Sequence, residues 1–195
     1  GMIFFKNDKS IISMPGVPYE MKAMVEDEVI PYLKNKYQLP FIFHRSILTA
    51  GVGETQLADR LIDFEKNKDS RIKLAYLPAV GKVRLRLTVK GEQKQELENL
   101  INQAKAEVVS CIGEYIYGYD EDVFEAKIGE LLLSQNLKIG TAESCTGGYI
   151  AHLLTSVAGS SRYFNGSIVS YANEVKENIL QVKNEMEAKA FLVKR

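Results

Sequence analysis

Alternating apolar and polar residues predict the strands of this chain, and apolar residues at helical spacing predict its helices. The clearest strand is "GKVRLRLTVKG", in which every second residue is apolar and the others are charged or carry a hydroxyl. One face of this strand should therefore be buried and the other should face water. The buried face is predicted to hold Val83, Leu85, Leu87 and Val89. Residues 92–112 then repeat apolar residues every three or four positions, so they predict a helix that covers this face.

The segment before this strand completes a compact unit. "FIFHRSILTAG" and "IKLAYLP" have the composition of strands, and "GETQLADRLIDFEKN" between them has helical spacing. We assign residues 39–117 to an α+β unit of this kind.

The N-terminal segment, residues 1–38, predicts a hairpin followed by helix. "MIFF" and "SIISM" flank a polar "KNDK" turn, and apolar residues recur at helical spacing after Pro18. Pro31 is predicted to divide the helical part into two short helices, because proline lacks an N–H group. An isolated hairpin is marginally stable, so we expect this segment to belong to something larger.

Strands and helices alternate in residues 118–195. The segments "VFEAKIGELLL", "GGYIAHLLTSV" and "NEVKENIL" predict helices, and "LKIGTA" and "FNGSIVSYA" between them predict strands. This alternation favours a parallel sheet, and the polar end, 183–195, predicts a further helix. The fold class expected for the whole chain is thus α+β in the middle and α/β towards the C-terminal end.

Composition limits the partners that we expect. The chain has 195 residues, with 25 basic and 25 acidic ones, so no overall field attracts nucleic acid or anionic lipid. No apolar run approaches the roughly 18 residues of a membrane span. Cys111 and Cys145 lack metal-ligand spacing and form no disulfide framework. We therefore expect a cytoplasmic protein without a metal or cofactor, and without nucleic-acid or membrane partners.

The densest group of reactive and small residues is "TAESCTGG", between a predicted strand and a predicted helix. Gly147 and Gly148 permit positive φ, and Ser144 and Thr146 add hydroxyl groups near the helix N-terminus. In open α/β sheets ligands bind at such strand ends, so the loop predicts a cradle for a phosphate or an oxyanion. The alternative is structural, because serine and threonine also cap helices.

A serine nucleophile at position 144 needs a base. His152 and His44 are badly placed for a Ser-His-Asp triad. "SYANEVK" instead places Tyr171 at a strand end and Lys176 one turn into the next helix. A lysine beside a hydroxyl can serve as a base when its pKa falls. The alternative is an ordinary strand tyrosine and a surface lysine.

Two neighbours of Ser144 also have two interpretations each. Cys145 would be a stronger nucleophile as a thiolate at a helix N-terminus, but a free cysteine is more often a small buried residue. Glu143 either binds a ribose hydroxyl or an ammonium group, or favours the helix N-terminus electrostatically.

Nucleic-acid binding by the middle unit is a further alternative. Arg84, Arg86 and Lys90 share one strand face, but residues 41–117 have a net charge near +2, and a solvated face is the commoner explanation. The loop "AGVGE" lacks the GxxG clamp that a KH module uses on RNA.

The order of several segments resembles the CinA family of competence/damage-inducible proteins. These are "SMPGVPYEMKAM", "GVGETQLADRL", "AYLPAVGKVRLRLT" and "TAESCTGGYIAHLLTSVAGSSRYFNGSIVSYANEVK". The resemblance implies the end of a molybdopterin-biosynthesis-like domain in residues 1–38, a KH-like domain in 39–117 and a C-terminal domain in 118–195. The pyrophosphatase activity associated with the first domain is not carried over, since only its end is present.

The resemblance also implies a reaction and the residues that perform it. The family's C-terminal domain hydrolyses the amide of nicotinamide mononucleotide (NMN) to nicotinic acid mononucleotide and ammonia, without a metal or cofactor. The implied catalytic residues are Ser144 as nucleophile, Lys176 as base and Tyr171 assisting. The implied substrate-binding residues are Glu143, Thr146, Gly147, Gly148 and Asn173.

The resemblance ends at Val182, where a glycine-rich "TGIAGP"-type stretch of the family is missing. We therefore expect an incomplete C-terminal domain, whose activity could be lost. The alternative function is a catalytically inactive remnant that associates with itself, as a homodimer or larger oligomer, or with a partner.

Overall fold

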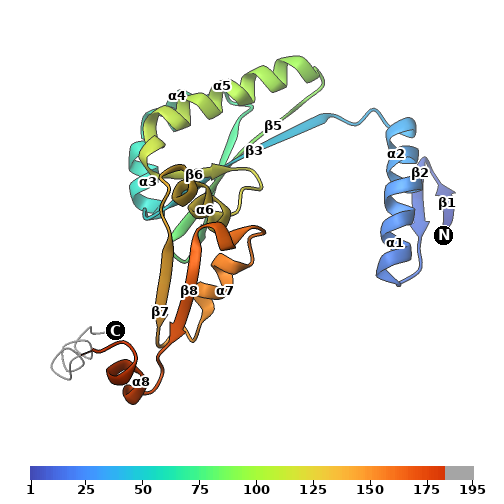
Figure 1. Cartoon of the computed structure of the whole chain (residues 1–195). Helices are drawn as coiled ribbons and strands as arrows, with labels where there is room; N and C mark the ends of the chain where they lie inside the picture. Colours follow the sequence, from blue (N-terminus) through green and yellow to red (C-terminus); the bar gives the residue numbers. More distant parts are fainter. Residues whose placement is uncertain (183–195) are drawn as a thin grey trace.

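The computed structural model describes residues 1–182, which form three groups of elements (Figure 1). The tail helix predicted for 183–195 lies outside these residues. No helix within residues 1–182 has the length and apolar character needed to cross a membrane. The N-terminal group consists of β1 (Met2–Lys6), β2 (Lys9–Ser13), α1 (Pro18–Met24), the π-helical turn η1 (Val25–Val29) and α2 (Ile30–Lys36).

The predicted hairpin is confirmed. Strands β1 and β2 are antiparallel, from Met2 opposite Ser13 to Lys6 opposite Lys9. Asn7 and Asp8 form the turn with φ of 49° and 60°. Two positive φ angles match the right-handed twist of the flanking strands, and asparagine and aspartate tolerate them better than most residues.

The two short helices predicted around Pro31 are joined into one helical run. Pro31 lies in the first turn of α2, and η1 separates it from α1. The N–H of Ile30 donates to the carbonyl of Val25, one residue further back than in an α-helix. A π-type turn before a proline accommodates the missing N–H without ending the helix.

Lys36 joins the hairpin to α2. Its Nζ lies 4.4 Å from the ring centroid of Phe5 and donates to Ser10 Oγ at 2.9 Å. Ser10 Oγ is also 3.0 Å from the hydroxyl of Tyr32. None of the side chains in these elements is fully buried, so the group is held by this polar and aromatic cluster more than by an apolar core.

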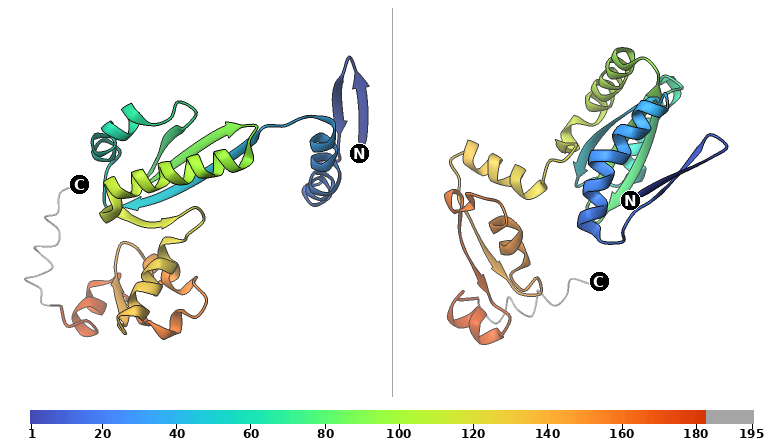
Figure 2. Two further views of the ribbon diagram at one scale, coloured as in Figure 1. Left: turned by 90° about the horizontal axis from the view of Figure 1, so that it is seen from above. Right: turned by 90° about the vertical axis from the view of Figure 1, so that its right-hand side faces the viewer.

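The middle group is a four-stranded antiparallel sheet with helices on one face (Figures 1 and 2). The strand order is β4-β5-β3-β6. Its strands are β3 (Phe41–Ala50), β4 (Lys73–Ala79), β5 (Lys82–Gly91) and β6 (Ile116–Tyr119), and its helices are α3 (Glu54–Arg60), α4 (Ile62–Asn67), α5 (Lys94–Ile112) and the 3-10 turn η2 (Gly113–Tyr115).

The main core lies between this sheet and its helices. The alternation in β5 is confirmed, because its four predicted apolar residues are almost completely buried. The helical side contributes Leu57 from α3, Phe64 from α4 and Leu61 between these two helices. Helix α5 contributes Leu97, Ile101, Ala104 and Val108. Helix α5 therefore covers the apolar face of the sheet, as predicted.

Two features of this group differ from the pattern in the sequence. The single helix predicted for 54–67 bends at Leu61, with φ −99° and ψ 7°, which keeps that side chain in the core. Strand β6 was not predicted, because four residues with one glycine carry too little pattern. It exists through its pairing with β3, and it extends the sheet to Tyr119, beyond the unit end expected at residue 117.

The C-terminal group pairs two parallel strands with helices, so the predicted parallel α/β arrangement is confirmed. Its elements are α6 (Phe124–Ser134), β7 (Ile139–Glu143), α7 (Tyr149–Thr155), the 3-10 turn η3 (Ser160–Arg162), β8 (Phe164–Val169) and α8 (Asn173–Asn178). Figure 1 shows β7 and β8 side by side, with α7 beside them.

Tyr163 joins three elements of this group. Its ring is buried, and its hydroxyl donates to the carbonyl of Leu154 in α7 at 3.2 Å. The ring lies against Gly129 of α6, where an added Cβ would be 2.7 Å from Tyr163 Cε1. Glycine at this helical position therefore permits close packing of α6 against the residue that precedes β8.

We predict that Gly129→Ala destabilises the C-terminal group. Alanine is favoured over glycine in a helix interior by about 1 kcal/mol, but overpacking against a buried ring typically costs about 1–3 kcal/mol. Urea unfolding followed by circular dichroism should show the loss. Gly113→Ala is the matched control, because a Cβ at Gly113 meets nothing within 4 Å. Equal midpoints for the two variants would contradict the prediction.

Candidate active site

The parallel pairing of β7 and β8 brings the two predicted parts of the site to one sheet edge. Glu143 at the end of β7 pairs with Val169 at the end of β8. The pairing continues through Ser170, whose N–H and hydroxyl donate to the carbonyl of Glu143 at 2.7 and 3.2 Å. Ser144 and Tyr171 therefore leave the same edge of the sheet, as the sequence predicted.

Both carboxylate oxygens of Glu143 are used by the protein itself. The side chain is only 2% exposed. Its Oε2 accepts the N–H of Ile150 at 3.0 Å, and its Oε1 accepts the N–H of Ala151 at 2.8 Å. The structure thus supports the structural alternative for Glu143, in which it stabilises the N-terminus of α7.

The surroundings of Glu143 favour its charged form. Burial alone would raise the pKa of this carboxyl group. The N–H groups of Ala151 and Ile150 and the hydroxyls of Thr146 and Thr141 outweigh that effect and lower the pKa to about 2. The carboxylate is therefore ionised at neutral pH.

Two hydroxyl groups support this carboxylate from the strands. Thr141 of β7 and Ser167 of β8 are opposite each other in the register, and Thr141 Oγ1 donates to Ser167 Oγ at 2.8 Å. Both hydroxyls also lie within 3.4 Å of Glu143 Oε1. Sequence reasoning missed these residues, because only the strand register shows that they face one another.

The loop after Glu143 has the glycine conformation that was predicted. Gly147 and Gly148 have φ of 59° and 92°. The N–H of Gly147 donates to the carbonyl of Ser144 at 2.9 Å, so it closes a turn and is not available to a ligand. A Cβ at Gly148 would lie 3.2 Å from Val169 Cγ2. These glycines shape the loop and let it approach β8.

Several polar groups of the loop have no protein partner. Within residues 1–182, the N–H groups of Cys145, Thr146 and Gly148 and the hydroxyl of Ser144 make no hydrogen bond. The residue before α7 is Gly148, which provides no side-chain cap. Since Glu143 satisfies the helix N-terminus instead, Ser144 is not a capping residue.

The predicted partners of Ser144 lie on and just before α8. Lys176 Nζ donates to Asn173 Oδ1 at 2.9 Å, and Tyr171 is 72% exposed. Ser144 and Lys176 are not joined by a hydrogen bond. In ligand-free enzymes such contacts are often long and shorten only with substrate. Cys145 is exposed, so it is not the small buried residue of its structural alternative.

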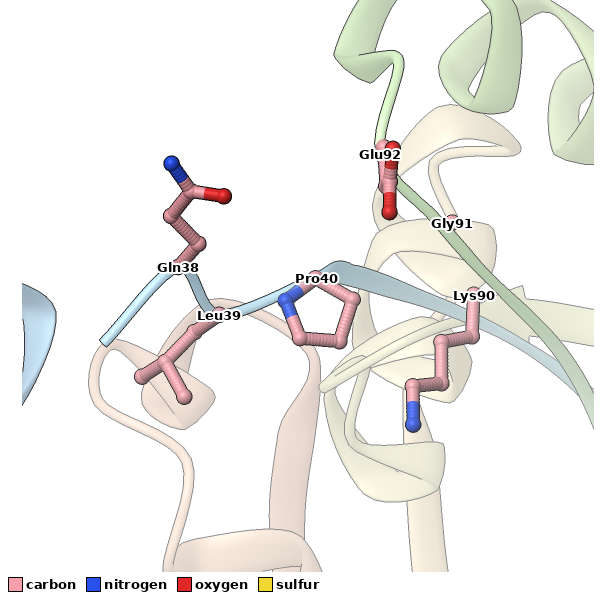
Figure 3. Close-up of a pocket in the computed structure, with 6 residues that line it drawn as sticks. All are labelled: Gln38, Leu39, Pro40, Lys90, Gly91 and Glu92. Carbon is pink, nitrogen blue, oxygen red and sulfur yellow. The ribbon is translucent and has the colours of Figure 1, made fainter. Parts of the chain in front are cut away.

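Other grooves lie away from this loop, and one of about 630 Å³ lies between β6 and α6. A second groove has no nucleophile in its lining. It has a volume of about 630 Å³ and is lined by residues 38–40, which lead into β3, and residues 90–92 at the end of β5 (Figure 3). Lys90 and Glu92 are its only ionisable side chains. A single cation and a single carboxylate without a nucleophile do not suggest a catalytic site. The candidate site therefore remains at the C-terminal ends of β7 and β8.

Comparison with known proteins places the chain in a family. Residues 44–118 match the family described as "Damage-inducible protein CinA KH domain", and residues 121–193 match "CinA C-terminal domain". The chain thus combines a KH domain with a CinA C-terminal domain. The second match continues past Val182, so the expectation that the resemblance ends at that residue was wrong.

Individual relatives carry the same names. The CinA-like protein of Cytophaga hutchinsonii is 48% identical over 189 residues, which are 97% of this chain and 45% of the relative. The CinA-like protein of Flavobacterium psychrophilum is 50% identical over 186 residues, or 95% of this chain and 44% of the relative. The chain belongs to the CinA family, and it spans about 45% of the length of these relatives.

A solved structure of a protein with a similar name matches a smaller part of the chain. The crystal structure of competence damage-inducible protein A from Klebsiella pneumoniae shares 34% sequence identity with this chain. The match covers 33% of this chain and 40% of that chain, with a TM-score of 0.32. The assignment of residues 1–38 to the end of a molybdopterin-biosynthesis-like domain stays a prediction.

We predict that Glu143→Gln destabilises the protein above about pH 5 and that this difference shrinks as the pH falls. The folded-state pKa of about 2 lies below the ordinary value of 4.5. The stabilisation is therefore complete above the unfolded-state pKa and is lost as the pH falls towards 2. Urea unfolding of wild type and variant across this range measures it. Glu174→Gln, an exposed change on α8, serves as the control, and a pH-independent difference for Glu143→Gln would contradict the assignment.

Proposed function

We propose that the C-terminal ends of strands β7 and β8, with the loops that follow them, form an amidohydrolase site. Its reaction is the hydrolysis of the carboxamide of NMN to nicotinic acid mononucleotide and ammonia. The observation that carries the proposal is the parallel pairing of β7 with β8. This pairing brings an unpartnered serine hydroxyl to the edge from which the segment with Tyr171 and Lys176 also leaves, and the resemblance to the CinA family names the substrate.

Ser144 is the nucleophile in this proposal. Its Oγ attacks the carboxamide carbon of NMN, and the carbonyl oxygen becomes an oxyanion. The main-chain N–H groups of Cys145, Thr146 and Gly148 have no acceptor among the described residues, so they can donate to that oxygen. One such donor typically stabilises the transition state by about 3 kcal/mol.

Lys176 is the general base and general acid in this proposal. In its neutral form it accepts the proton of the Ser144 hydroxyl as the C–O bond forms, and it then donates that proton to the amide nitrogen. The C–N bond breaks and ammonia leaves, which produces an acyl-enzyme on Ser144. Water attacks this ester with Lys176 as base, and nicotinic acid mononucleotide is released. Asn173 positions the lysine through its 2.9 Å hydrogen bond.

The remaining predicted residues act around this centre. Tyr171 is exposed and follows Ser170, which is bonded to Glu143, and we assign it to assist Lys176 and to contact the pyridine ring. Gly147 and Gly148 give the loop its conformation, and Thr146 contributes an N–H group. Glu143 acts through the helix it holds and is a positioning residue, because its carboxylate is buried.

We predict that Ser144→Ala abolishes ammonia release from NMN, whereas Cys145→Ala retains at least about a tenth of the wild-type rate. Loss of a covalent nucleophile typically lowers kcat by several orders of magnitude, and Cys145 would only contribute its main-chain N–H. Ammonia release by the whole chain, measured with a coupled assay, tests both variants. The opposite pattern would make Cys145 the nucleophile, and wild type without ammonia release would reject the proposed reaction.

A second candidate is a non-catalytic, self-associating protein. The observation that favours it is the sheet of β7 and β8, whose outer edges have no further strand within residues 1–182. Exposed apolar side chains lie on β8 and α7, namely Ile168, Val169, Tyr149 and Ile150. Free strand edges and exposed apolar groups are the usual elements of a subunit interface.

For this candidate we expect a homodimer or larger oligomer that Ile168→Glu dissociates, because a charge on the strand would be desolvated in the interface. Sedimentation velocity of the whole chain at several concentrations measures association. Val80→Glu is the control, since Val80 is fully exposed at the β4–β5 turn in the middle group. A wild-type monomer at every concentration would exclude the interface.

A further inference from the structure

One face of the four-stranded sheet carries a row of cations. The face that opposes the helices presents Arg84, Arg86 and Lys90 from β5, all exposed. The register places Lys73 of β4 and His44 of β3 opposite Thr88 on the same face. We call this surface the basic sheet face, made of Lys73, Arg84, Arg86, Lys90, His44 and Thr88.

This face has no carboxylate of its own. None of the strands β3, β4, β5 and β6 contains aspartate or glutamate. All ten acidic residues between 41 and 117 lie on the helices and connections, whereas six of the twelve basic residues lie on the strands. The small net charge of this unit is therefore a sum over an acidic helical side and a basic sheet.

The arginines of the two sides also differ in their ion pairs. On the helical side, Arg60 pairs with Glu114 at 2.7 Å, and Arg71 pairs with Glu96 at 2.6 Å. Within residues 1–182, Arg84 and Arg86 have no ion pair or hydrogen bond. The charges of Arg84 and Arg86 are thus not compensated by an ion pair, and their positive potentials add along one strand.

Acidic groups lie at one margin of this face, where Glu125 and Asp122 both act electrostatically on Tyr117, as Arg84 does. Asp122 lies near Tyr117 at the β6 side, but its carboxylate is paired with Lys127 at 3.4 Å. Asp120 accepts the N–H of Ser46 at 2.8 Å. Neither Asp122 nor Asp120 forms an ion pair with Arg84 or Arg86, so the row from Arg84 to Lys90 keeps its charge. This row is about 20 Å long at the rise of an extended strand.

We propose that the basic sheet face binds single-stranded nucleic acid through its phosphates. Arginine forms paired hydrogen bonds with phosphate oxygens, and cations at every second residue of a strand follow an extended polyanion. Ile42 and Leu77, 53% and 39% exposed, lie on the same face next to Lys90 and Arg84. They offer apolar contacts to bases, which an acidic peptide does not require.

This site is distinct from the two surfaces discussed above. The basic sheet face lies in the middle group, whereas the nucleophile loop lies at the end of β7. It is also opposite the helices and separate from the loop Gly51–Gly53, so it does not rely on the GxxG clamp that this chain lacks. The proposal does not depend on the amidohydrolase reaction.

The test measures binding of the whole chain to a fluorescent homopyrimidine oligonucleotide by anisotropy. With four cations engaged, the logarithm of affinity should fall with that of salt at a slope of about −3, so binding weakens about 50-fold from about 50 to about 200 mM salt. Arg84→Gln with Arg86→Gln should reduce the slope by about 1.4. Lys73→Gln with Lys90→Gln is a second, independent pair and should act similarly.

The control pair is Lys66→Gln with Lys94→Gln, which removes the same charge from exposed positions on the helical side. Its slope should equal that of wild type. The proposal is overturned by absence of binding at about 50 mM salt, by an equal loss in the control pair, by tighter binding of a duplex, or by equal competition from polyglutamate, which would indicate an acidic protein partner. Circular dichroism melts of all variants verify that they are folded.

Discussion

The buried carboxylate of Glu143 is the interaction on which the candidate site depends. Its oxygens hold the first N–H groups of α7, and its main-chain carbonyl holds Ser170 as the chain leaves β8. The helix N-terminus is therefore already occupied by a protein anion. The N–H groups left for a ligand are those of the loop between Glu143 and α7, beside the hydroxyl of Ser144.

The two sheets are stabilised in different ways. The four-stranded sheet shares a continuous apolar core with α3, α4 and α5. In the C-terminal group, by contrast, the buried side chains within the described residues are Leu154 and Tyr163 together with the polar Glu143 and Ser170. Hydrogen bonds that are specific in direction thus take a larger part in positioning the site than apolar contacts do. A polar network of this kind tolerates few substitutions, because each buried polar group needs its partner.

Much of the fold could be predicted because it follows from the local periodicity of apolar and polar residues. The alternation in β5, the helical spacing of α5 and the Asn7–Asp8 turn each need only neighbouring residues. Strand β6 and the contacts of Ser167 could not be predicted, since they exist only through pairing with a distant strand. At the candidate site, the positive φ of Gly147 and Gly148 was predictable from residue type. For Glu143 the sequence left two roles open, ligand binding and stabilisation of the helix N-terminus. Only its burial in the structure decides between them.

The sequence by itself determined the order of strands and helices, the glycine turn after Glu143 and the segments that resemble the CinA family. The tertiary structure decided which of these residues meet. The parallel register placed Ser144 and Tyr171 on one edge, and the antiparallel register placed Lys73 and His44 beside the cations of β5. The physical reason is that composition and net charge are sums over the chain, whereas burial and electric potential depend on position. A unit with almost balanced charge can therefore carry an acidic side and a basic side, and only the fold separates them.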